Sequence, residues 1–352
     1  MSIFSQGISL SQHKDPALSG GIIPFIGLNE RRLAHSGFAD LSEVEPNEIL
    51  EIAKTAEIVD EADGKAIYRK MQRARGAAAI VIADAVDDEP YVSSKMAPAL
   101  FMGEEMLAGL MLCQKTGGTD RAIIMMNRHP GHLQARIPKE IGGIEVIRLQ
   151  GGYPAQPTPD RLRLGKLSGR KMIISAGALV HLSRAVMQAK AQTTAFITVA
   201  GNCVAHPMNL EVSLGVTVSQ VLERCGLTHE PKKIVCGGPM TGFEILDAER
   251  TIITKNTRAI LAFRQSDTEY NYTCIGCGKC EVACPNGLNP MYIRRLMKLH
   301  FYPPLAPFDA HLCIGCGTCS YVCPSRLNLV ESMLEARAYA RAHFNLAGGD
   351  NP

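Results

Sequence analysis

Eight of the twelve cysteines lie in two short runs near the carboxyl end, and these are the residues best suited to chemistry. The runs consist of Cys274, Cys277, Cys280 and Cys284, and of Cys313, Cys316, Cys319 and Cys323. Each run follows the pattern C-x2-C-x2-C-x3-C and is followed at once by a proline. Thiolates at this spacing are typical ligands of [4Fe–4S] clusters. The runs therefore predict two such clusters, with electron transfer as their chemistry.

The spacing also predicts how the thiolates are shared between the clusters. Three thiolates two residues apart reach three irons of one cluster, whereas the fourth cysteine of a run lies too far along to complete it. We therefore expect each run to lend its last cysteine to the other cluster. The expected ligand sets are Cys274, Cys277, Cys280 and Cys323 for one cluster, and Cys313, Cys316, Cys319 and Cys284 for the other.

Glycines between the cysteines support this interpretation. Gly276, Gly278, Gly315 and Gly317 allow the backbone to wrap closely, so that N–H groups can point at the sulfurs. Zinc is the alternative metal, but structural zinc sites typically use two C-x2-C pairs separated by a longer loop. Zinc gives no reason for a third cysteine at the same spacing in both runs. The scattered Cys113, Cys203, Cys225 and Cys236 are expected to be small buried side chains.

Composition excludes several classes of protein. The 352 residues are 46% apolar and 20% charged, which indicates two or three folded domains. A net charge of +3, without a basic block containing aromatic residues, argues against nucleic-acid binding. No apolar run approaches the ~20 residues of a membrane span, and residues 1–15 do not resemble a signal peptide. We expect a cytoplasmic protein that could dock peripherally on the inner membrane through partners.

The elements that must position the cysteines fall into several predicted domains. Residues 1–46 are expected to be an N-terminal segment with short strands. Helical and strand patterns alternate over 47–193, which predicts an α/β domain with a mainly parallel sheet. Residues 194–265 predict a β-grasp module of a hairpin, one helix and two strands. The helix has Thr217 and Gln220 as a capping box and Gly226 after its end.

The cysteines themselves lie in a predicted helical ferredoxin domain, residues 266–345, followed by a tail, 346–352. Helices are expected at 289–300 and 328–343. The fold class is thus multidomain, with an α/β domain, an α+β module and a two-cluster domain.

An acidic segment follows the buried strand pattern of the α/β domain. Residues 80–95, IVIADAVDDEPYVSSK, place Asp84, Asp88 and Glu89 at the carboxyl end of a strand, where open α/β sheets bind ligands. Recognition of a ribose or a nicotinamide is one interpretation. A solvated acidic loop is the other, and the base rate for surface charges favours it for this segment alone.

Several stretches resemble the RnfC family, a component of the Rnf electron transport complex, and its relative, the cobalamin reductase of propanediol utilisation. They are LSQH (10–13), ADAVDDEPYVSSK (83–95), GALVHLSRAV (177–186), ITVAGNCVAHPMNLEVSLGVTVSQVL (197–222), VCGGPMTGF (235–243) and the two cysteine runs. The resemblance covers residues from about 80 to the end. It implies an α/β domain like the flavoprotein of respiratory complex I, a β-grasp module of the SLBB type, and electron flow from NADH through FMN to the clusters. Asp84, Asp88, Glu89 and Tyr91 become the candidate residues for FMN or NADH.

The chain departs from this family at the loop that holds FMN. The family has a glycine-rich stretch there, because backbone N–H groups must approach the phosphate. This chain has VDEADGKAIYRKMQRARG (59–76) instead, with acids in place of glycines and Lys65 as the compensating cation. Asp84 also replaces the family's asparagine.

These observations favour an electron-transfer subunit that relays electrons through two [4Fe–4S] clusters within a larger oxidoreductase. Expected partners are other redox subunits, a ferredoxin, a flavoprotein or a corrinoid protein. The alternative is a complete reductase that passes electrons from NADH through FMN to the clusters. A third interpretation, an adaptor with vestigial clusters, is disfavoured because all eight cysteines are present. Whether the chain is an enzyme by itself stays open at this point.

Overall fold

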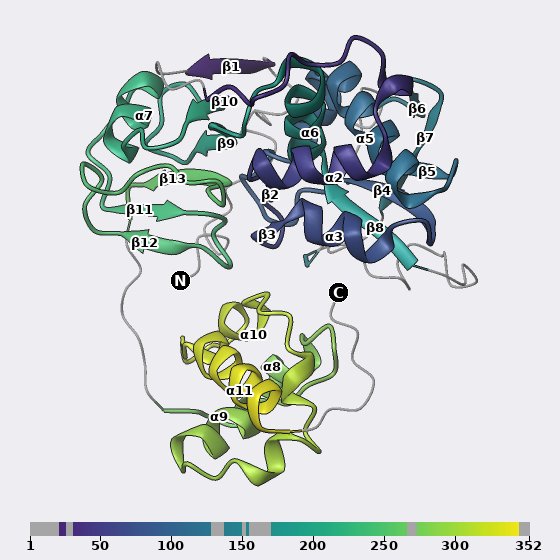
Figure 1. Ribbon diagram of the computed structural model, residues 1–352. Helices are drawn as coiled ribbons and strands as arrows, with labels where there is room; N and C mark the ends of the chain where they lie inside the picture. Colours follow the sequence, from purple (N-terminus) through teal and green to yellow (C-terminus); the bar gives the residue numbers. More distant parts are fainter. Residues whose placement is uncertain are drawn as a thin grey trace. The chain divides into compact units, whose positions relative to one another are not determined.

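The computed structural model describes residues 21–25, 31–127, 137–149, 153–154, 170–265 and 273–344. The predicted tail and the first twenty residues, including LSQH, lie outside these ranges. The chain forms two compact units, which meet between residues 265 and 266. The larger unit carries two sheets, and the smaller one carries the cysteine runs (Figure 1).

The first sheet of the larger unit is the predicted parallel α/β sheet. Its order is β6-β7-β5-β4-β8, and the four strands from β7 to β8 run parallel. The strands are β4 (Ala78–Ala85), β5 (Ala122–Asn127), β6 (Glu140–Ile141), β7 (Ile144–Leu149) and β8 (Arg170–Ser175). β4 is central and almost wholly buried, which suits its run of alanine, isoleucine and valine.

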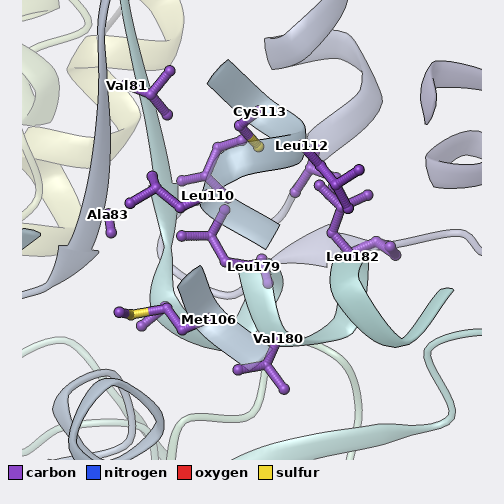
Figure 2. Packing of buried hydrophobic residues seen from close by; sticks show 14 of the residues in the cluster. Val81, Ala83, Met106, Leu110, Leu112, Cys113, Leu179, Val180 and Leu182 are labelled. Carbon is purple, nitrogen blue, oxygen red and sulfur yellow. The ribbon is translucent and has the colours of Figure 1, made fainter. Parts of the chain in front are cut away.

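Five helices belong to this sheet: α2 (Pro46–Thr55), α3 (Ile67–Ala74), α4 (Met96–Phe101), α5 (Gly103–Gly117) and α6 (Ala176–Gln188). Figure 2 shows side chains of α5, such as Leu110, interleaved with Leu179 and its neighbours on α6 beside Val81 and Ala83 of β4. The two helices approach so closely that a Cβ on Gly109 would lie 2.1 Å from the carbonyl oxygen of Leu179. Glycine is therefore required at this crossing.

Two short elements precede these helices or join them. The 3-10 helix η2 (Leu41–Glu43) precedes α2, and a small hairpin of β2 (Val59–Asp60) and β3 (Lys65–Ala66) leads into α3. The hairpin turn carries the acidic residues that replace the glycine-rich loop of the RnfC family.

The second sheet has six strands in the order β1-β10-β9-β13-β11-β12. Its elements are β1 (Ile22–Phe25), β9 (Thr194–Ala200), β10 (Met208–Ser213), α7 (Val218–Cys225), β11 (Lys233–Cys236), β12 (Phe243–Ile245) and β13 (Ala259–Phe263). The predicted antiparallel ribbon is β9 with β10, and α7 has the predicted capping box of Thr217 and Gln220. The sequence did not predict that β1 pairs in parallel with β10, at the edge of this sheet.

Buried polar contacts join the two sheets of the larger unit. Arg184 of α6 forms ion pairs with Glu105 of α5, at 3.1 Å, and with Glu211 of β10. Ser93 donates its hydroxyl to Asn209 of β10 at 3.0 Å, and its backbone N–H to Thr198 of β9 at 2.9 Å. These contacts fix the segment after β4 against the second sheet.

The smaller unit is helical. It contains α8 (Lys279–Val282), α9 (Pro290–Lys298), η4 (Pro303–Leu305), η5 (Ala310–Leu312), α10 (Thr318–Tyr321) and α11 (Leu329–His343). Its core includes Ile293, Leu296, Leu305, Met333 and Ala336. The helices predicted at 289–300 and 328–343 correspond to α9 and α11.

The predicted fold class is confirmed, whereas the exact domain boundaries stay predictions. In the part of the chain that is described, no helix combines the length and apolar character needed to cross a bilayer.

Candidate metal centre and acidic network

The two cysteine runs have the same local structure. The third cysteine of each run is buried and lies in a one-turn helix, Cys280 in α8 and Cys319 in α10. The residue before each helix has a left-handed conformation, with φ of 73° at Gly278 and 74° at Gly317. A residue with a Cβ would be strained there. Both runs therefore use glycine to curl the backbone around a point, as the sequence predicts.

Backbone N–H groups reach one sulfur in each run. Gly276 donates to the Sγ of Cys274 and Gly315 donates to the Sγ of Cys313, both at 3.4 Å. Hydrogen bonds of this kind stabilise the negative charge of a thiolate.

Four cysteines line each of two cavities in the smaller unit. The first cavity has a volume of about 640 Å³, open solvent included, and is lined by Cys274, Cys277, Cys280 and Cys323. The second cavity has a volume of about 340 Å³ and is lined by Cys313, Cys316, Cys319 and Cys284. Each cavity combines three cysteines of one run with the last cysteine of the other. The structure thus brings together both predicted sets, while ligation itself stays a prediction.

The thiols also influence one another across the two runs. Burial raises the pKa of Cys280, and the charge of Cys323 contributes to this rise. Burial, followed by the charges of Cys316 and Cys313, raises the pKa of Cys319 to about 12, with a smaller contribution from Cys284. Four neighbouring thiolates are stable only opposite cations, which the irons of a cluster provide. The donor sets therefore fit [4Fe–4S] clusters.

No three His, Cys, Asp or Glu side chains within the described ranges converge closely enough to hold a single metal ion. A cluster of four irons takes one thiolate at each of four metal atoms. The four cysteines around each cavity are the donors to be tested for this mode of binding.

The two cavities differ in how firmly their walls are held. Three successive carbonyl oxygens ahead of and at the start of the second run accept side-chain hydrogen bonds. The bonds run from Arg341 to His311 at 3.1 Å, from Asn286 to Leu312 at 2.6 Å, and from Arg337 to Cys313 at 3.0 Å. The first run is more open, with Ile275 67% and Val282 88% exposed.

The four candidate FMN or NADH residues lie in the segment that follows β4. Asp84 ends this strand and pairs with Lys95 at 3.2 Å, where both side chains are almost fully buried. Its other carboxylate oxygen accepts the N–H of Val86 at 3.0 Å. Burial raises the pKa of Asp84, although Lys95 opposes this rise.

Asp88 and Glu89 share a second cation. Arg258 donates to Asp88 at 2.6 Å and lies 3.7 Å from Glu89. Although burial opposes it, the charges of Lys95 and Arg258 lower the pKa of Asp88. Glu89 also accepts the N–H of Met240 at 2.7 Å and the hydroxyl of Thr241. The GGPMTG turn of the second sheet is thus held by Glu89.

Tyr91 has a left-handed backbone conformation, with φ of 65°, and its ring meets Phe263 edge-on at 5.8 Å between centroids. The structure therefore brings the four candidate residues into one network within the larger unit, and each has partners inside the protein. Their binding of FMN or NADH stays a prediction.

Sequence reasoning missed the cations of this region. Lys95 and Arg258 are far apart in the sequence and meet at Asp88, at 3.9 Å and 2.6 Å. Lys70, rather than Lys65, pairs with the buried Asp60, at 2.7 Å. The helical position of Lys70, one turn into α3, was the signal that could have indicated this pair.

Two protein families match parts of the chain. Residues 273–327 match the 4Fe-4S dicluster domain, and residues 196–244 match the SLBB domain. The first match contains all eight cysteines of the runs. The second match covers β9, β10, α7 and β11.

Curated relatives match a longer part of the chain, and all three described here are RnfC-type components of redox complexes. The relative from the proton-translocating ferredoxin:NAD(+) oxidoreductase complex of Clostridium ljungdahlii is 25% identical over 240 residues, which are 63% of this chain and 52% of that protein. The relative from an ion-translocating oxidoreductase complex of Rhodobacter capsulatus is 29% identical over 60% of this chain and 44% of its own length. The corresponding protein of Vibrio cholerae is 25% identical over 72% of this chain and 35% of its own. The chain spans about half the length of these relatives, or less.

A solved structure supports the fold. The NAD+-reducing [NiFe]-hydrogenase in its H2-reduced state superimposes with a TM-score of 0.53 and 17% identity. The superposition covers 86% of this chain and 62% of the hydrogenase chain. At this identity the likeness concerns the fold alone.

Proposed function

For this chain, which is RnfC-like in sequence, we propose the function of an electron-transfer subunit in a larger oxidoreductase. The observation that carries the proposal is the gathering of four cysteines at each of two cavities, with every quartet drawn from both runs. The match to a 4Fe-4S dicluster domain over the same residues supports iron–sulfur clusters as the occupants.

In this proposal the chain holds two clusters. Cys274, Cys277, Cys280 and Cys323 would hold one cluster, and Cys313, Cys316, Cys319 and Cys284 the other. A [4Fe–4S] cluster, when bound, gains or loses one electron at a time. The residues of the chain hold the irons, donate N–H groups to the sulfurs and limit the access of water.

The shared cysteines suit a relay. Because Cys284 and Cys323 each line the cavity of the other run, the two sites are covalently linked through short stretches of chain. Close sites favour electron transfer from one to the other over loss to solvent.

The partners would be other redox proteins of the complex. The name of the Clostridium ljungdahlii relative includes a ferredoxin, and a ferredoxin is therefore our first candidate, ahead of a flavoprotein or a corrinoid protein. We place the protein in the cytoplasm, docked through its partners on the inner membrane.

Anaerobic purification of the full chain tests the proposal. We expect about eight irons and as many sulfides per chain, and one-electron signals in electron paramagnetic resonance spectra after dithionite reduction. Cys236→Ser, which changes a cysteine of the second sheet outside both runs, should keep the iron content and serves as the control. Material with zinc or without sulfide would refute the proposal.

The alternative is a reductase that uses NADH through FMN. It is favoured by the name of the relative in Clostridium ljungdahlii, which includes NAD(+). Stoichiometric FMN and rapid reduction of the clusters by NADH alone would select this alternative.

A further inference from the structure

The place where a doubly wound sheet binds its ligand can be located in this chain. Strand order runs from β4 through β5 to β7 on one side, and β8 then lies on the other side of β4. The chain order therefore reverses between β4 and β8. Open α/β sheets bind ligands at such a reversal, beyond the carboxyl ends of the strands, with a phosphate at the following helix N-terminus. Here that helix is α6, which begins directly after Ser175.

Carboxyl groups of the chain itself take this place. Asp60 accepts the backbone N–H of Ser175 at 3.2 Å, at the N-terminus of α6. Glu61 accepts the hydroxyl of Ser175 at 2.6 Å. A Cβ on Gly177, in the first turn of α6, would lie 2.8 Å from the Oε1 of Glu61. The two carboxyl groups therefore fill the space that a phosphate would need.

Charge in this region reinforces the same conclusion. Asp60 is 1% exposed and pairs with Lys70, so the nearest cation is already neutralised. Lys95, the other buried lysine, pairs with Asp84 at the carboxyl end of β4. The Oε1 of Glu61 is buried and has no hydrogen-bond partner in the described part of the chain. An incoming phosphate would meet buried carboxyl groups whose cations are engaged, which is unfavourable.

We propose that Asp60 and Glu61 occupy the phosphate position at the N-terminus of α6, so that the chain holds no flavin of its own and exchanges single electrons with protein partners. The second part rests on the proposed function. A hydride donor delivers two electrons at once, whereas each cluster accepts one. Without a flavin to divide the pair, each transfer oxidises the donor protein by one electron and reduces a cluster by one. The donor is thus a one-electron carrier, such as an iron–sulfur protein or a flavoprotein semiquinone.

Two binding measurements on the full chain test this proposal. Equilibrium dialysis of the anaerobically purified wild type against FMN should show no binding. Inorganic phosphate should not change its melting temperature. Asp60→Gly, which vacates the N-terminus of α6 and releases Lys70, should gain a melting temperature that rises with phosphate concentration.

Asp63→Gly is the matched control. Asp63 belongs to the same turn and lies 3.0 Å from Lys70, but has no contact with α6 among those described. It should show no response to phosphate. If Asp60→Gly is insoluble with and without phosphate, Asp60→Asn takes its place, and the same response to phosphate is expected of it.

Stoichiometric FMN in the wild type, or a phosphate response missing from the Asp60 variant, would overturn the proposal. Iron and sulfide are measured in the same samples. Bound FMN together with intact clusters would refute this inference alone, whereas missing clusters would refute the proposed function.

Discussion

The guanidinium of Arg337 donates a hydrogen bond to the backbone carbonyl of Cys313, 3.0 Å away, and the first run has no such contact among those described. A positive charge beside a cluster favours the state with the extra electron and raises the reduction potential. Arg337→Gln should therefore lower the potential of one cluster, by on the order of tens of millivolts.

A redox titration followed by electron paramagnetic resonance measures this shift. Arg341→Gln is the matched control, because Arg341 lies one turn further along α11 and donates to the more distant His311. Equal shifts of both clusters, or equal effects of the two variants, would contradict the specific role of Arg337.

Cys284→Ser should remove the cluster of the second cavity, although Cys284 belongs to the first run. The reason is that Cys284 lines the cavity of Cys313, Cys316 and Cys319. Iron should fall from about eight to about four per chain. Cys323→Ser is the reciprocal variant and should remove the other cluster. Loss confined to the cluster of Cys274 in the Cys284 variant would show that the ligands do not cross.

Lys95→Met should destabilise the larger unit by about 3–5 kcal/mol, because it leaves the Asp84 carboxylate buried without its cation. Urea unfolding followed by circular dichroism measures the loss. Lys65→Met removes a more exposed partner of Asp63, at 3.7 Å, and should cost less than about 1 kcal/mol. The double variant Lys95→Met/Asp84→Asn should recover part of the stability. A loss as small as that of Lys65→Met would contradict the pairing.

The stability of the larger unit should fall as pH rises from about 4.5 to 7, through Glu61. Burial, followed by the charge of Asp60, raises the pKa of Glu61 to about 7 from an ordinary value of 4.5. A carboxyl group with a raised pKa in the folded state stabilises it below its unfolded pKa, and this contribution is lost as pH rises through the folded value. The contribution is at most about 3 kcal/mol.

Urea unfolding at several pH values measures this dependence. Glu61→Gln should flatten the pH dependence in that window, since its amide keeps a donor and loses the ionisation. An unchanged slope in Glu61→Gln would assign the pH dependence to another group.

The sequence predicted the metal centre well because its information is local. The spacing within each run and the glycines between the cysteines determine the turns around Cys280 and Cys319, and the crossing of the last cysteines follows from chain length. The parallel sheet was predictable for a similar reason, since the buried run 78–85 and the helices around it have clear patterns.

The acidic network was less predictable because its partners are distant in the sequence. Lys95 and Arg258 come from different domains and meet at Asp88 only after both have folded. The hairpin of β2 and β3 brings Lys70, on the following helix, to Asp60, so that the nearest lysine in the sequence was the wrong one. The pairing of β1 with β10 involves only four residues and leaves no periodic signal.

The exchange of cysteines between the runs has a consequence for how the protein matures. The wall of the first cavity includes Cys323, so that this cavity is incomplete until the ribosome has passed the second run. Iron delivered earlier would find only three thiols in place. Loading must therefore follow synthesis of nearly the whole chain, and a truncation before Cys323 would leave the first site with an open corner as well as removing part of the second.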